Sequence, residues 1–162
     1  MTSAGVQPSS KPGRRGAIAI IARPPFLFSA GEAIDFSRLE VLAIRRSMTV
    51  AAPGALCFPG GGVEAGEAPD EAARRECREE VGLDVQVVAY LAQNATPSGA
   101  PLYWFSAEIP GSDFNDEAIC LQPDEVADYE WRSLPSLLAD PDFLPNNAEI
   151  VRKIIAGEIP LR

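Results

Sequence analysis

The sequence predicts a single domain of mixed α/β (α+β) class, with a mixed central β-sheet and helices on both of its faces. The chain has 162 residues, enough for one domain with a substantial core. Hydrophobic residues make up 46% of it, as in ordinary globular proteins. Strand-like and helix-like segments follow the order β-β-β-α-β-β-β-α-α, which fits a mixed sheet covered on both sides.

Three strands are expected before the first helix. Gly16–Ala22 is apolar and rich in β-branched residues, which predicts a buried strand. The proline-containing stretch 23–38 predicts a loop or insertion. Leu39–Arg45 alternates in polarity and predicts a second strand, and a Pro53-Gly54 turn precedes a short third strand at Leu56–Phe58.

The first helix is expected over Pro69–Val81. Proline suits the first helical position, because its missing N–H group would have no partner there. Asp70 and Glu71 place negative charge at the positive end of the helix dipole, and Gly82 is a suitable stop. The capping signal is incomplete, since Ala68 stands where serine, threonine or aspartate is expected.

The remaining elements follow from turn signals and apolar patterns. Strands are expected at 84–93, 101–109 and 128–132, with an acidic loop over 111–126. Ser133 is expected to cap a brief helix to Ala139, and Asn146 or Asn147 a terminal helix to Ala156.

Composition excludes several classes of function. The net charge of −9 disfavours extended nucleic-acid binding, although a metal and a few arginines would still admit a nucleotide. No apolar run approaches the roughly 20 residues of a membrane span. Residues 1–15 are polar and are expected to form a disordered leader to a domain over 16–162. Three cysteines without a CxxC pair favour reduced thiols and the cytoplasm.

The absence of histidine narrows the chemistry further. No Ser-His or Cys-His couple and no histidine-ligated zinc can form. The two lysines both lie near the ends of the chain. Carboxylates, together with a metal, are therefore the expected catalytic groups.

Carboxylates cluster in the segment Gly61–Leu83, which has the pattern G-x5-E-x7-R-E-C-x-E-E-x-G-L. On a helix, Glu76, Glu79 and Glu80 share one face within an arc of roughly 100°. Their mutual repulsion would be relieved by a cation, and hard oxygen ligands favour Mg²⁺ or Mn²⁺. A solvated acidic face is the usual alternative, but the glycine-rich turn just before it, Phe58–Gly62, would let the backbone approach a ligand or metal closely.

These residues resemble the Nudix hydrolase family. The fixed positions of the Nudix box are all present, and Cys77 and Leu83 occupy its apolar positions. Leu56 departs from the tryptophan often found two residues before the phenylalanine of the lead-in. The resemblance implies an α-β-α sandwich. The matching box positions are Gly61, Glu67, Arg75, Glu76, Glu79, Glu80 and Gly82.

The resemblance also implies a mechanism. Mg²⁺, with Mn²⁺ as a substitute, would be held by Glu76, Glu79, Glu80 and the Gly61 carbonyl, and a water would attack phosphorus to release a monophosphate. Glu67 and Arg75 would support the loop and orient the ligands. A further glutamate outside the box serves some members as base or ligand. Here the candidates are Glu125 and, behind it, Glu117, with a solvated loop carboxylate as an equal alternative.

The substrate side of the site is less defined by the sequence. Arg45 and Arg46 are candidates for phosphate contact, against simple exposure at a strand end. Tyr103 and Phe105 share one face of a strand, opposite Trp104, and are candidates for base stacking or for core packing. The resemblance implies a small nucleotide-type substrate: a nucleoside triphosphate, a nucleotide sugar or ADP-ribose type, or a dinucleotide. A binding module without catalysis is the alternative function, and a homodimer stays open.

Overall fold

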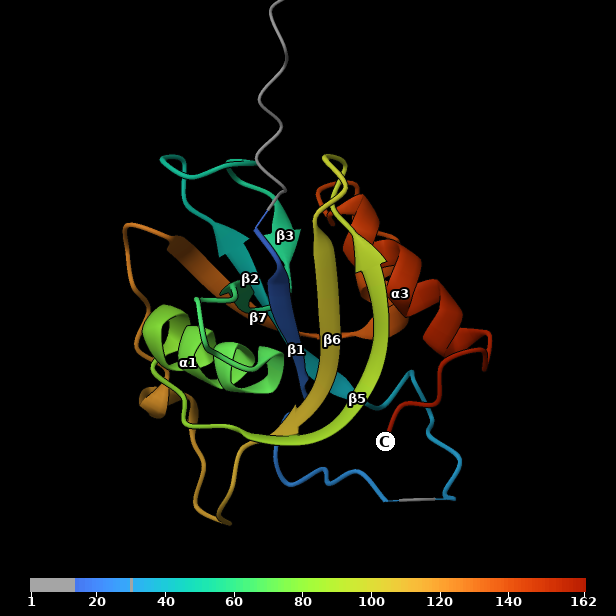
Figure 1. Ribbon diagram of the computed structural model, residues 1–162. Helices are drawn as coiled ribbons and strands as arrows, with labels where there is room; N and C mark the ends of the chain where they lie inside the picture. The colour runs from blue at the N-terminus through green and yellow to red at the C-terminus, as the bar shows by residue number, and fades with distance from the viewer. Residues whose placement is uncertain (1–13, 30) are drawn as a thin grey trace, which may run out of the picture.

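The computed structural model describes residues 14–29 and 31–162, so most of the expected leader lies outside the described residues. Figure 1 shows a layered arrangement of strands with helices on two sides. The elements are β1 (Gly16–Ile21), β2 (Glu40–Arg46), β3 (Leu56–Cys57), β4 (Gly60–Gly62), α1 (Pro69–Val81), β5 (Gln86–Ala95), β6 (Pro101–Glu108), the short 3₁₀ helix η1 (Asp116–Ala118), β7 (Val126–Ser133), α2 (Leu134–Leu138) and α3 (Pro145–Ile155).

The strands form a mixed four-stranded sheet and a separate three-stranded sheet. The first has the order β4-β1-β6-β5, and the second has the order β3-β2-β7. Strand β1 runs parallel to β6 and antiparallel to β4. Because both edges of β1 are occupied, β2 pairs with β3 and β7 instead, and it meets the first sheet at the bridge Ala22–Val41. The mixed α+β fold class is therefore confirmed, with the strands divided between two sheets.

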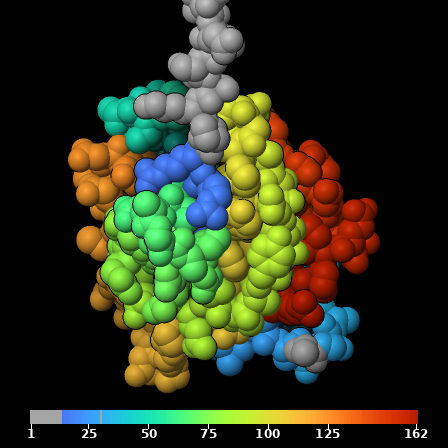
Figure 2. Space-filling model, viewed as in Figure 1, coloured from blue at the N-terminus to red at the C-terminus, as the bar shows by residue number. Residues whose placement is uncertain are grey.

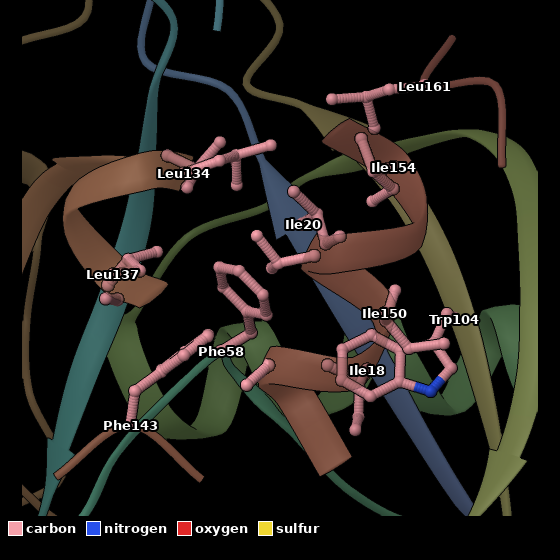
Figure 3. Close-up of a cluster of buried hydrophobic side chains, with 14 of the residues drawn as sticks. Ile18, Ile20, Phe58, Trp104, Leu134, Leu137, Phe143, Ile150, Ile154 and Leu161 are labelled. Atoms are coloured by element: carbon pink, nitrogen blue, oxygen red, sulfur yellow. The ribbon is translucent and has the colours of Figure 1, made fainter. Parts of the chain in front are cut away.

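Each face of β1 contributes to a different core. Ile18 and Ile20 point into a core closed by α2 and α3, which also contains Phe58 and Trp104 (Figure 3). Ala17, Ala19 and Ile21 face a second core, which α1 closes with Ala72, Ala73, Cys77 and Val81. Burial on both faces explains why this strand is a continuous apolar run rather than an alternating one.

The first helix has the bounds that the sequence predicts. Ala68 is its N-cap and makes no side-chain cap bond, while the Glu71 carboxylate accepts a hydrogen bond from the Ala68 N–H group at 3.0 Å. Gly82 ends the helix in the left-handed region, with φ of 72°. None of the helices in the described ranges is long and apolar enough to cross a bilayer.

Two local expectations differ from the structure. Gly60–Gly62, expected as a turn, is strand β4, and a Cβ atom at Gly60 would lie 2.4 Å from the carbonyl oxygen of Ala17. Only glycine therefore fits this close pairing. The terminal helix begins at Pro145 after the N-cap Leu144, so the prediction that Asn146 or Asn147 caps it is wrong. The Asn147 side chain instead accepts a hydrogen bond from the Phe58 N–H group at 2.9 Å.

Candidate active site

Arg75 binds three carboxylates of the Nudix-box pattern, Glu67, Glu76 and Glu79. We call Arg75, Glu67 and Glu79 the Arg75 group. Its Nε and Nη2 atoms donate to the two oxygens of Glu67 at 2.7 and 3.1 Å, and Nη1 donates to Glu79 at 3.1 Å. Nη2 also donates to the Gly62 carbonyl oxygen at 2.8 Å. The guanidinium lowers the pKa of Glu67. Arg75 thus ties the loop before α1 and strand β4 to the helix, as a supporting residue does.

A second set of carboxylates, the Glu80 group, consists of Glu76, Glu80 and Glu125. One oxygen from each lies within 4.8 Å of the other two. Glu80 is only 5% exposed, and its nearest backbone donor is the Gly60 N–H group at 3.4 Å. Burial, and then the negative charge of Glu76, raise the pKa of Glu80 to about 9. Burial also raises the pKa of Glu76, although Arg75 Nη1 donates to it at 3.0 Å.

Two of the three carboxylates in the Glu80 group have no cation to balance their charge. Within the part of the chain that the structure describes, neither Glu80 nor Glu125 forms an ion pair. A Cβ atom at Gly61 would lie 2.4 Å from the Glu76 carboxylate, so the backbone approaches this group as closely as only glycine allows. Carboxylate oxygens beside exposed backbone are the donors that a hard divalent cation prefers. The residues therefore fit a divalent metal ion.

The expected metal ligands divide between the two groups. Glu76 and Glu80 lie together with Gly61, whereas Glu79 is 55% exposed and bound to Arg75. Glu125, a candidate from outside the helix, joins the Glu80 group. Glu117 lies in η1 and is not part of this group.

Two adjoining clefts meet at strand β4. A cleft of about 280 Å³ is lined by the Glu80 group, Ile44 and Val50. A neighbouring cleft of about 350 Å³ has Ile18, Phe58 and Leu102 on its walls and Asn146 at its edge. Figure 2 shows the blue first described residues against the green β4 and α1 region that forms this side of the molecule. The residues shared by both clefts are Arg46, Gly60, Gly61 and Gly62.

The two adjacent arginines of β2 have different surroundings. Arg46 lines both clefts, and its Nε atom donates to the Ala51 carbonyl oxygen at 2.6 Å. Arg45 points elsewhere, because its Nη1 atom donates to Asp142 at 3.0 Å and to the Gly54 carbonyl oxygen at 3.3 Å. Successive strand residues face opposite sides of a sheet, so only one of the pair reaches the site.

A family model described as NUDIX domain matches residues 31–154 of the chain. The chain belongs to the Nudix family. Curated relatives include an NAD-capped RNA hydrolase NudC of Stutzerimonas stutzeri, 35% identical over 74% of this chain and 40% of that protein. An 8-oxo-dGTP diphosphatase of Escherichia coli is 33% identical over 71% of this chain and 85% of that protein. The chain thus spans less than half the length of the NudC relative.

Solved structures share the Nudix fold of this chain. The MutT protein from Methanosarcina mazei superimposes with a TM-score of 0.65 at 19% identity, over 90% of this chain and 94% of that one. A Caenorhabditis elegans Ap4A hydrolase in a binary complex also gives 0.65, at 20% identity, over 89% and 98%. The α-β-α sandwich that the Nudix resemblance implies is confirmed by these neighbours.

The aromatic candidates lie in the core of the Nudix domain. Phe105 is 6% exposed and packs edge-on against Tyr90, with ring centroids 5.8 Å apart. Tyr103 packs against the same core, and Trp104 lies on the opposite face, as the strand pattern predicts. Neither Tyr103 nor Phe105 lines either cleft at β4. Their position favours the packing role over base stacking.

Sequence reasoning missed three residues that line the larger cleft. Arg14 lies at the end of the polar segment, where nothing in the pattern distinguishes it, and its Nε atom donates to the Val63 carbonyl oxygen at 3.4 Å. Asn146 and Asn147 line the same cleft from the start of α3. The sequence suggested these asparagines as helix caps, but no local pattern indicated that Asn147 contacts the distant Phe58.

Proposed function

We propose that this Nudix domain is a Mg²⁺-dependent hydrolase of a diphosphate linkage in a nucleoside diphosphate joined to another moiety. Candidate substrates are a nucleoside triphosphate, a nucleotide sugar or ADP-ribose type, and a dinucleotide, with a monophosphate released. The observation that carries the proposal is the Glu80 group, three carboxylates that lie together in a cleft lined by Arg46 and share one protein cation, Arg75, which contacts only Glu76. The names of the relatives, an 8-oxo-dGTP diphosphatase among them, support the same reaction class.

Glu76, Glu80, Glu125 and the Gly61 carbonyl would hold Mg²⁺, with Mn²⁺ as a substitute. Glu79, the fourth ligand that the Nudix resemblance implies, is bound to Arg75 and could join them only by leaving it. When bound, such a metal neutralises phosphate charge and lowers the pKa of a bound water. Glu125 is the exposed member of the group, so it is the carboxylate best placed to take a proton from an attacking water. The water oxygen bonds to phosphorus, the anhydride P–O bond breaks, and the bridging oxygen leaves with the second phosphate.

The arginines would recognise the phosphates. Arg46 borders both clefts, and Arg14 lines the larger one. Within the described ranges neither guanidinium forms an ion pair, so both are available to an anion. The apolar walls at Ile18, Phe58 and Leu102 would cover the moiety attached to the diphosphate. The three free cysteines fit a reducing, cytoplasmic location.

The test is turnover on a panel of nucleoside triphosphates, nucleotide sugars and dinucleotides with Mg²⁺, for the natural sequence and for Glu80→Gln. Release of a monophosphate that Glu80→Gln abolishes is the expected result. Glu117→Gln is the matched control, because this carboxylate lies outside the group and its loss should leave the rate unchanged. Tight nucleotide binding without turnover on any substrate would instead identify a binding module.

A further inference from the structure

The segment that carries Glu125 is held on two sides by hydrogen bonds. Residues 122–125 form a turn in which the Glu125 N–H group donates to the Gln122 carbonyl oxygen at 3.0 Å. On one side, the Gln122 N–H group donates to the Glu80 carbonyl oxygen at 2.9 Å, which ties the turn to the end of α1. The main chain of Glu80 thus holds the segment that carries Glu125.

On the other side, the turn is held by two hydroxyl residues that follow β2. The Ser47 hydroxyl donates to the Asp124 carbonyl oxygen at 2.7 Å, and the Thr49 hydroxyl lies 3.0 Å from the same oxygen. The Ser47 N–H group donates to the Glu125 carbonyl oxygen at 2.9 Å. We call Ser47 and Thr49 the hydroxyl clamp.

Burial of Ser47 makes the clamp more than a surface contact. Ser47 is 6% exposed, one of only four polar or charged residues buried in the described part of the chain. Its hydroxyl and that of Thr49 lie 3.1 Å apart, so each restricts the other. The clamp also lies where the β2–β7 pairing is irregular, with a shift in register between Arg45 and Arg46. Regular strand pairing therefore ends just where Glu125 must be positioned.

We propose that Ser47 and Thr49 are positioning residues for Glu125, and that they act on metal affinity through it. The inference rests on the proposed function, because it takes the Glu80 group to be a metal site. Neither hydroxyl belongs to the metal group or to the Nudix box. Both bind main-chain oxygen at the turn, so removal of a hydroxyl loosens the turn and lets the Glu125 carboxylate move, without changing any carboxylate of the site. Residues that orient metal ligands typically contribute about tenfold or more to metal affinity.

The experiment measures Mn²⁺ binding to the purified full chain by titration calorimetry, without substrate. Ser47→Ala and Thr49→Val are each expected to weaken Mn²⁺ affinity by about tenfold. Thr49 is exposed, so Thr49→Val carries the test if Ser47→Ala does not fold. Thr49→Ser keeps the hydroxyl and should bind Mn²⁺ as the natural sequence does. Met48→Ala changes an exposed side chain of the same loop and is the second control.

A double-mutant cycle separates positioning from general damage to the fold. In the Glu125→Gln background, the clamp substitutions should weaken Mn²⁺ binding by less than about twofold, because their route to the metal is already lost. An equal loss in both backgrounds would overturn the proposal, and so would unchanged affinity in the Glu125-containing protein. A natural chain that binds no Mn²⁺ would overturn the proposed metal site itself, an outcome distinct from these two.

Discussion

Two neighbouring rows of side chains on α1 each carry a glutamate in the last turns of the helix, and these two glutamates have opposite electrostatic surroundings. One row pairs Arg75 with Glu79 at a spacing of four residues, and this row is partly exposed and internally neutralised. The adjacent row pairs Glu76 with Glu80 at the same spacing; Glu76 also contacts Arg75, whereas Glu80 lies beside Glu125 and has no ion pair in the described residues. The comparison teaches that, of the three helix carboxylates, only Glu80 has no cation supplied by the described chain, so the need for a metal is greatest at Glu80 and at Glu125 beside it.

The largest expected effect comes from Glu80, in the row of Glu76 and Glu80. Glu80→Gln should lower turnover by about a thousandfold, equivalent to about 4 kcal/mol of barrier, because it removes the most buried carboxylate of the site. The metal-free melting temperature at neutral pH should rise in the same variant, since a buried amide is neutral without the proton that Glu80 must take up on folding. Steady-state kinetics and thermal unfolding monitored by circular dichroism measure the two effects. An unfolded Glu80→Gln chain would make this residue structural and remove the contrast between the rows.

The same row should make the metal-free protein sensitive to pH. The pKa of Glu80 is about 9 in the folded chain and 4.5 ordinarily, so between these values the folded protein keeps a proton that the unfolded chain has lost. The contribution of Glu80 to the free energy of unfolding is therefore fully present below pH 4.5 and is lost as pH rises toward 9. The free energy of unfolding falls over this range by at most about 1.4 kcal/mol per pH unit. Urea unfolding in a chelator measures it, and Glu80→Gln should flatten the profile. A flat profile in the natural chain would mean that Glu80 is not protonated when buried.

The neutralised row should respond in stability. Arg75→Lys keeps the charge but cannot reproduce the two-pronged contact to Glu67 or the bond to the Gly62 carbonyl oxygen. The melting temperature should fall by roughly 5 °C. Differential scanning calorimetry with and without Mg²⁺ measures the change in melting temperature. If stability were unchanged while turnover fell, Arg75 would act on the substrate and the division between the rows would not hold.

Glu79→Gln is expected to have the smallest effect. Its carboxylate is exposed and already bound to Arg75, so the loss in turnover should be about tenfold or less. Kinetics at saturating Mg²⁺, run beside Glu80→Gln, make the comparison. A loss as large as that of Glu80→Gln would show that Glu79 leaves Arg75 to join the metal site during turnover.

Much of the fold followed from local patterns. The bounds of α1 came from Pro69, the acidic first turn and Gly82, because helix ends are set by interactions a few residues long. The buried strand β1 came from its apolar run. The division into two sheets was not visible, because strand partners are chosen by contacts between distant segments. The α3 boundary was missed for the same reason, since Asn147 serves Phe58 rather than the helix end.

The sequence by itself determined the Nudix family, the fold class and the placement of Glu76, Glu79, Glu80 and Arg75 on one helix, because helical periodicity is a local property. Only the tertiary structure decided which of these carboxylates share a site. It tied Arg75, the helical neighbour of Glu79, to Glu67 and Gly62, brought Glu125 to Glu80 from a segment distant in sequence, and set Arg46 rather than Arg45 at the clefts. The physical reason is that burial and ion pairing depend on which distant segments meet, and a one-dimensional pattern does not record that.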